Sequence, residues 1–272
     1  MKKNRSLYKI LGVLISISML FSLAPSVVAV EALEAAENAL SEISENISAQ
    51  AESYNSTAIT VTEPSQDSDG YYLIGTAGEL YWFAEYVNAG NSQVNAKLTA
   101  DIVVNENLLE SITYDDEGNV TNDGSFVAWT PIGTRVSSSE NSPFSGEFDG
   151  QDYEISGLFY NNVTDGSYIG LFGYTLSAII KNIGLVDSYI AAMQYVGGIC
   201  GFLKDTSDAT GEISGCYNNS RVKGKYTVAG ICSYAGSYTV ISNCYNEGEI
   251  TGLSEIYDEG EETLLIAGGM AG

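Results

Sequence analysis

The stretch Ile169-Gly-Leu-Phe-Gly173, followed by Ile180-Lys-Asn-Ile183 and Val196-Gly-Gly-Ile-Cys-Gly201, is one copy of a unit that recurs along the chain. The first signature of this unit is Gly-x-x-Gly or a close variant, at residues 170–173, 198–201, 230–233 and 269–272. The second is Ile-x-Gly/Asn followed by an apolar residue, at residues 155–158, 180–183, 213–216 and 241–244. Two signatures that alternate in constant order indicate a structural repeat.

The second signature recurs in steps of 25, 33 and 28 residues, which suits one coil of two or three short strands with their turns. The runs between glycines are short and rich in β-branched and aromatic residues, as strands are. Between Phe144 and Gly272 no run is long enough for a helix. The sequence therefore predicts an all-β fold, a parallel β-solenoid with a right-handed β-helix as its expected form. The alternative is an antiparallel β-sandwich in which the glycines recur by coincidence.

The four cysteines fall at equivalent places of successive units, Cys200 with Cys232 and Cys216 with Cys244. Stacked coils would bring each pair to a spacing of about 4.8 Å, but parallel Cβ atoms disfavour the dihedral angle of a disulfide. Apolar residues fill the same positions in earlier units, so we expect two ladders of buried free thiols. A Cys₄ zinc site is disfavoured, because the ladders lie on different strands.

Tyr217 and Tyr245 each follow a ladder cysteine. If the cysteines point inward, alternation along the strand points the tyrosines outward. An outward stack of rings is a candidate ligand-binding ladder for sugar faces or a partner protein. The alternative is mutual stacking that only stabilises adjacent coils.

The first 29 residues have the pattern of a secretory signal: a basic start, an apolar run from Ile10 to Leu23 and small residues before the expected cleavage between Ala29 and Val30. An uncleaved membrane anchor is the alternative. Removing residues 1–29 leaves seven basic against 35 acidic residues, a net charge of −28. Such a charge disfavours nucleic acid and anionic membranes as partners. We expect a secreted or extracellular protein, associated with the cell wall and without membrane insertion after cleavage.

Residues 30–70 are acidic, with a heptad-like apolar stripe, and are expected to form a helical stalk or a disordered linker. Residues 71–143 are expected to form a small α/β cap over the N-terminal end of the solenoid, which would occupy residues 144–272. Thr76 and Glu79 form a capping box before a helix predicted from Ala77 to Ala89. A strand is predicted over residues 98–104, where apolar residues alternate.

The segments Trp129-Thr-Pro-Ile-Gly133, Phe144-Ser-Gly-Glu-Phe-Asp-Gly150 and the Gly-Leu-Phe-Gly173 series resemble secreted bacterial proteins with GLUG motifs. The motif is shared with immunoglobulin A metalloproteases of Gram-positive bacteria. The resemblance covers residues 71–272 and implies a surface-exposed β-solenoid, often within a larger multidomain protein. It implies no chemistry by itself, since a fold does not fix a function.

The chain has no histidine, so the His-Glu-x-x-His zinc site of those metalloproteases has no counterpart in it. The same absence excludes a Ser-His-Asp triad and a Cys-His pair as catalytic groups. The carboxylates Asp149, Asp152 and Glu154 and the basic pair Lys223 and Lys225 are better explained as structural. Residues 65–70 imitate the start of an EF-hand loop but lack its bidentate glutamate. We expect that the chain is not an enzyme and that it binds no cofactor and no metal.

Three functions remain open. The first is a non-catalytic adhesion or interaction module of the cell surface, with host or environmental glycans or surface proteins as partners. The second is a spacer or recognition domain of a larger secreted metalloprotease. The third is a β-helix carbohydrate-active enzyme. Residues 269–272 complete a signature without a polar cap after it, so we expect further repeats in a longer reading frame. The sequence does not determine the oligomeric state.

Overall fold

The computed structural model describes residues 59–137, 139–253 and the backbone of 266–268. The predicted signal peptide with its cleavage between Ala29 and Val30, residues 30–58 of the predicted stalk and residues 269–272 lie outside the described residues. The chain divides into Met1–Ala58 and Ile59–Gly272, and only the second unit is described below.

The elements of this unit are, in chain order, β1 (Tyr71–Ile74), α3 (Ala77–Asn88), β2 (Asn95–Leu98), β3 (Ile102–Val103), α4 (Leu108–Ser111), the 3₁₀ turn η1 (Asp123–Ser125), β4 (Thr134–Arg135), β5 (Asn141–Ser142), β6 (Glu147–Asp149), β7 (Glu154–Ser156), β8 (Phe159–Ile169), β9 (Phe172–Leu176), β10 (Ile179–Lys181), β11 (Gly184–Gly197), β12 (Cys200–Lys204), β13 (Gly211–Ser214), β14 (Tyr217–Gly224), β15 (Thr227–Ala229), β16 (Cys232–Ala235), β17 (Thr239–Ser242), β18 (Tyr245–Asn246), β19 (Ile250–Gly252) and β20 (Ile266–Gly268).

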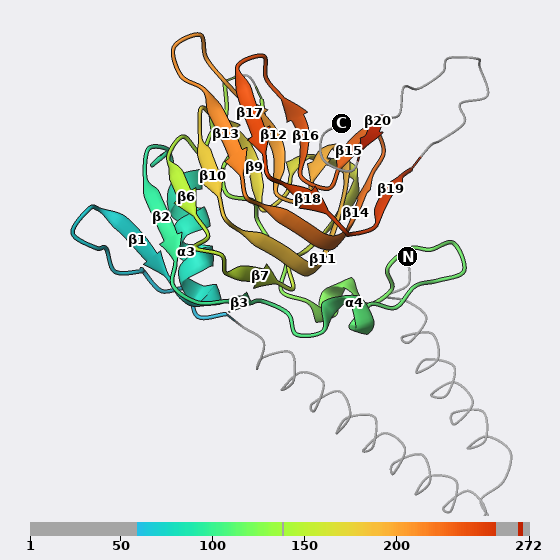
Figure 1. The fold of residues 1–272 in the computed structure, drawn as a ribbon. Helices are drawn as coiled ribbons and strands as arrows, with labels where there is room; N and C mark the ends of the chain where they lie inside the picture. Colours follow the sequence, from blue (N-terminus) through green and yellow to red (C-terminus); the bar gives the residue numbers. More distant parts are fainter. Residues whose placement is uncertain (1–58, 138, 254–265, 269–272) are drawn as a thin grey trace, which may run out of the picture. The chain divides into compact units, whose positions relative to one another are not determined.

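Like residues of successive coils lie side by side, as the repeat predicts. In the sheet β1-β2-β6-β10-β13-β17 every pairing is parallel, and Ile213 lies between Ile180 and Ile241. The other sides of the coil are a nine-stranded sheet around β11 and β14 and the sheet β16-β12-β9, also with parallel pairings (Figure 1). The only antiparallel pair among the described named strands is the short hairpin β4–β5. The parallel β-solenoid is therefore confirmed, and the β-sandwich alternative is wrong.

The cap is built as predicted at its helix, but its strands differ from the prediction. The Thr76 hydroxyl accepts a hydrogen bond from the Glu79 amide, and the Glu79 carboxylate accepts one from the Gly75 amide at 2.8 Å. Apolar residues on one face of α3 are buried against the first coils: Leu80, Phe83, Ala84 and Val87. Strands β1 and β2 extend the six-stranded sheet itself, so the cap supplies that sheet's first rungs (Figure 1).

The single strand predicted over residues 98–104 is two strands. The chain bends at Thr99 and Ala100, so that β2 pairs with β6 and β3 pairs with β7 in the neighbouring sheet. Alternation of apolar residues continues across this corner because Leu98 and Ile102 both point into the same core. Periodicity alone therefore did not reveal the break.

Replacing Thr76 with alanine is expected to lower the free energy of unfolding by about 1 kcal/mol, because the first turn of α3 loses its side-chain acceptor. Urea denaturation measures the change. Thr210→Ala is the matched control, since Thr210 is exposed in the loop between β12 and β13. Equal stability of the two variants would contradict the assigned cap.

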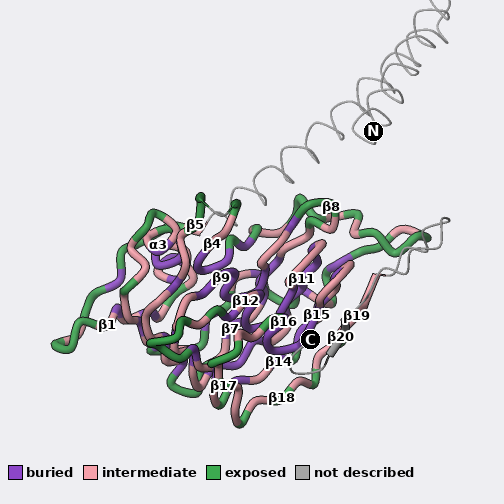
Figure 2. Tube along the Cα trace, turned by 90° about the horizontal axis from the view of Figure 1, so that it is seen from above, coloured by how far each residue is buried: buried purple, intermediate pink, exposed green. Residues whose placement is uncertain are grey.

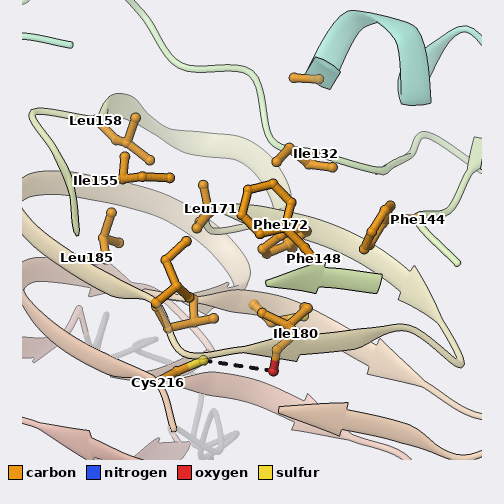
Figure 3. Close-up of a cluster of buried hydrophobic side chains, with 14 of the residues drawn as sticks. Ile132, Phe144, Phe148, Ile155, Leu158, Leu171, Phe172, Ile180, Leu185 and Cys216 are labelled. Atoms are coloured by element: carbon orange, nitrogen blue, oxygen red, sulfur yellow. Dashed lines mark hydrogen bonds between the residues drawn. The ribbon is translucent and has the colours of Figure 1, made fainter. Parts of the chain in front are cut away.

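The interior of the coils is apolar. Figure 2 shows buried residues along the strands and exposed residues gathered at the turns. Near the cap the ring of Phe172 packs at centroid distances of 5.3 Å from Phe144 and 5.2 Å from Phe148 (Figure 3). Phe83 of α3 contacts both Phe144 and Phe148. Each coil thus covers the apolar face of the coil before it.

The cysteines continue this interior as free thiols. Cys200 pairs in register with Cys232, and the Cys216 thiol contacts the Ile180 carbonyl oxygen at 3.8 Å (Figure 3). Cys216 and Cys244 are flanked by the register pairs 214–242 and 217–245. Three of the four thiols are buried as predicted, whereas Cys244, in the last described coil, is only partly buried.

Cys244 is expected to be the one thiol of the folded protein that reacts readily with iodoacetamide. A hydrogen bond with Cys216 lowers the pKa of Cys244 to about 7, so much of it is thiolate at pH 8. Cys200, Cys216 and Cys232 should react at least about 100-fold more slowly, since they need local opening of the core. Peptide mass mapping against time checks this, and equal modification of all four thiols would contradict the stacked interior.

Candidate binding surface: stacked aromatic columns

Tyr217 and Tyr245 form the outward column that the sequence predicts. Their ring centroids are 5.1 Å apart and the ring planes differ by 3°. Tyr217 pairs in register with Gly184 of β11, where a Cβ atom would lie only 2.4 Å from the tyrosine ring. The ring of Tyr217 therefore needs glycine beneath it. Tyr245 is the last ring of this column within the described residues, with 49% of its surface exposed.

The hydroxyl of Tyr217 reaches past Gly184 and holds this column to β7, two coils earlier. It donates a hydrogen bond to the carboxylate of Glu154, whose backbone N–H donates to Asp101 Oδ1 at 2.9 Å. Burial and this hydrogen bond raise the pKa of the Tyr217 phenol, so it stays protonated and remains a donor. The column is thus a rigid surface. The stacking is observed, and its predicted use in ligand binding remains a prediction.

The predicted carboxylate cluster has structural partners. Asp149 accepts a hydrogen bond from the Gln151 amide at 3.0 Å and forms an ion pair with Lys181. Burial raises the pKa of Asp149, but these hydrogen bonds and the Lys181 charge outweigh it and lower the pKa below its usual value. Glu154 accepts the hydrogen bond from the Tyr217 hydroxyl. Asp152 has a left-handed backbone conformation in the turn, with φ of 63°. The carboxylates of Asp149 and Glu154 thus have structural partners within the fold.

The remaining candidates for chemistry also have local partners. Lys223 lies 6.0 Å from the ring centroid of Tyr189, and the Lys225 amide donates to the Met193 carbonyl. In the turn that resembles an EF-hand, Asp67 accepts from two backbone amides and forms an ion pair with Lys97. Across residues 59–137 and 139–253, no group of three or more metal-ligating side chains is placed to hold an ion.

A larger set of outward rings lies where β11 turns into β12 and at the same place in the neighbouring coils. We call it the aromatic cluster; its members are Tyr168, Tyr174, Tyr195, Phe202 and Tyr234. It contains two columns. In the first, Tyr168 stacks on Tyr195 with centroids 5.0 Å apart. In the second, Phe202 stands between Tyr174 at 5.6 Å and Tyr234 at 4.2 Å.

The two columns of the aromatic cluster interlock edge to face. Tyr195 meets Phe202 at an interplanar angle of 84° and Tyr234 at 85°. Tyr168 and Tyr195 both adopt left-handed backbone conformations, with φ of 62° and 52°. Such a conformation costs a bulky residue about 1–3 kcal/mol, which the surrounding structure must offset. The backbone is therefore strained where it sets these two rings beside the second column.

A cation covers one end of the aromatic cluster. The guanidinium carbon of Arg135, in β4, lies 5.4 Å from the ring centroid of Tyr168 and 5.1 Å from that of Tyr174. Both distances are in the range of cation–π attraction. Tyr234 is the last ring of the cluster within the described residues, and 43% of it is exposed.

The aromatic cluster was not predicted from the sequence, although a signal for it was present. Tyr174, Phe202 and Tyr234 each directly follow a Gly-x-x-Gly signature, and Tyr168 and Tyr195 each precede one by two or three residues. Aromatic residues flanking a repeated signature predict a stack, as Tyr217 and Tyr245 did. The left-handed turns that bring the two columns together are not evident from the residue types.

No protein-family model matches the chain. A protein of Evansella cellulosilytica, provisionally named a Gly-rich membrane protein, is 32% identical over 134 residues, which are 48% of this chain and 13% of that protein. A crystal structure from Bacteroides ovatus, provisionally named an immunoglobulin A1 protease, matches over 78% of this chain and 87% of its own, with 16% identity and a TM-score of 0.36. The chain thus spans about an eighth of the curated relative it matches, and the GLUG resemblance rests on the motif residues themselves.

Among the residues that the structure describes, neither helix has the length and apolar character to cross a bilayer.

Proposed function

We propose that the chain is a non-catalytic interaction module of the bacterial cell surface, which binds its partner through the aromatic columns outside the coils. The observation that carries this proposal is the placement of rings outside a core that is already complete. Tyr217 and Tyr245 stack over Gly184, and the aromatic cluster interlocks on the β9-β12-β16 side.

Packing between coils explains why the rings stack on one another, but it does not explain the exposure of the last rings. A ring inside a column has both faces covered by its neighbours. Within the described residues, Tyr234 and Tyr245 are the last rings of their columns and are 43% and 49% exposed. Rings held in one orientation lose little conformational entropy when a ligand stacks on them, which favours binding. Flat sugar faces suit this surface.

The double variant Tyr217→Ala/Tyr245→Ala is expected to abolish the binding to host glycans or mucin that this column contributes, while leaving the protein folded. A glycan array and a mucin-coated surface measure retention, and circular dichroism checks the fold. Tyr238→Ala is the matched control, since Tyr238 is 62% exposed and belongs to neither column. Unchanged retention of the double variant would refute a role for this column in binding.

The setting of the module is part of the proposal. We infer that it is exported and lies in a longer envelope protein, which the name of the Evansella relative and its greater length support. The second candidate, a spacer or recognition domain of a larger secreted metalloprotease, would need a catalytic domain outside this chain. The complete gene distinguishes them: a His-Glu-x-x-His segment in the same reading frame would favour the protease.

A further inference from the structure

Arg135 is, like Lys204 and Lys223, a basic residue without an ion pair to a carboxylate of the described residues. The sequence has 11 basic against 35 acidic residues. Lys97, Lys181 and Arg221 each form an ion pair with a carboxylate. Within the described residues no carboxylate lies within 4.0 Å of the Arg135 side chain, which instead rests over the rings of Tyr168 and Tyr174. A guanidinium without a carboxylate partner, held against rings in an acidic protein, is complementary to an anionic ligand.

The other end of the aromatic cluster offers a stacking corner. In the pairing of β11 with β15, Val196 lies beside Val228, and the residue before Val228 is Thr227, so no aromatic residue follows Tyr195 in the first column. Tyr234 stands at 85° to Tyr195 and forms the wall of the corner. A sugar ring placed here would meet apolar ring surface through its C–H face, and the hydroxyls of Thr227 and the tyrosines through its own hydroxyls.

The distance between the two features sets the size of the ligand. Tyr195 is one rung beyond Tyr168, at 5.0 Å, and the Arg135 guanidinium carbon is 5.4 Å from Tyr168. The Arg135 guanidinium is therefore about 10 Å from the ring of Tyr195, and a sugar stacked on the far face of that ring lies one rung further on, about 15 Å from Arg135. That span fits three linked sugar units rather than one.

We propose that the aromatic cluster and Arg135 bind an acidic oligosaccharide, in which the carboxylate of a uronic or sialic acid pairs with Arg135 and a sugar two units along the chain stacks in the corner of Tyr195 and Tyr234. This deepens the proposed function and rests on it. A cationic peptide would meet Arg135 with like charge. The remote negative charge of the chain is screened beyond about 8 Å at physiological salt, so the local guanidinium governs a ligand in contact with it.

Binding of matched acidic and neutral sugars to the purified protein tests the proposal by calorimetry. Trigalacturonate against galactotriose examines the uronic acid, and 3′-sialyllactose against lactose examines the sialic acid. Wild-type protein should prefer at least one acidic sugar over its neutral match. Arg135→Gln should weaken that binding roughly tenfold and leave the neutral sugar unchanged, because a charge-assisted hydrogen bond is lost. Tyr234→Ala should weaken the acidic and the neutral sugar alike.

Arg221→Gln is the control, because it makes the same change of charge at an arginine paired with Glu249. It should bind as the wild type does. The proposal would be overturned if wild type bound acidic and neutral sugars with equal affinity, or if Arg221→Gln lost as much affinity as Arg135→Gln. Binding of a proline-rich peptide in place of sugars would also overturn it. If wild type binds glycans and Arg135→Gln binds them equally, only this inference fails. If wild type binds no glycan and no mucin, the proposed function fails with it.

Discussion

Replacing Gly197 with alanine is expected to destabilise the protein by about 3 kcal/mol or more, the first of the two largest effects we foresee. A Cβ atom at this position would lie 2.0 Å from the carbonyl oxygen of Cys200 and 3.1 Å from that of Ile231. Both atoms are backbone of the chain's own turn and of the next coil, so neither moves without breaking the stack. This close approach explains the glycine before the signature at 198–201.

Gly124→Ala is the control for Gly197→Ala, since nothing lies within 4 Å of a Cβ atom at Gly124. Urea denaturation followed by circular dichroism gives the midpoint and slope for both variants. The control should remain close to wild type. A Gly197→Ala protein as stable as the control would mean that the coils do not approach each other as described.

Phe172→Ala is expected to cost about 4 kcal/mol, because it removes a fully buried ring and leaves a cavity that its neighbours fill only in part. Phe172 joins two coils, with the rings of Phe144 and Phe148 at 5.3 and 5.2 Å. The control is Tyr238→Ala, an exposed aromatic residue for which a change within about 0.5 kcal/mol is expected. Thermal and urea unfolding measure both. Equal stability of the two variants would contradict the shared interior.

The features of the fold that follow from local pattern were predicted from the sequence. Repeated residues such as Ile180, Ile213 and Ile241 lie in one column because a parallel stack places equivalent positions together. The helix α3 followed from its capping box and one apolar face. Both inferences need only residue types and their spacing.

The features that depend on distant partners were not predicted. The corner between β2 and β3 keeps the same alternation of apolar residues, so nothing local marks it. The start of α4 is capped from far along the chain, where the Asp187 carboxylate accepts hydrogen bonds from the amides of Leu108 and Leu109. Neither contact has a signature within the segment that it organises.

The candidate binding surface likewise has a part that was predictable from the sequence and a part that was not. The Tyr217 and Tyr245 stack was predictable because each tyrosine follows a ladder cysteine. The role of Gly184 beneath Tyr217 was not, since it depends on the register between two coils. Arg135 is more remote still: it lies outside the repeats in the hairpin β4–β5 and meets the aromatic cluster only through the fold. Arg135, which suggests an anionic ligand, therefore could not be found from the repeat.

The stacking of like residues is tested most directly by the distance between two labels one coil apart. Glu212 of β13 and Val240 of β17 are register partners 28 residues apart. Glu212 is partly exposed and Val240 is exposed. With spin labels at Glu212→Cys and Val240→Cys in a Cys244→Ser background, backbones about 4.8 Å apart predict a strongly broadened electron paramagnetic resonance spectrum. A spectrum equal to the sum of the two singly labelled proteins would contradict the solenoid.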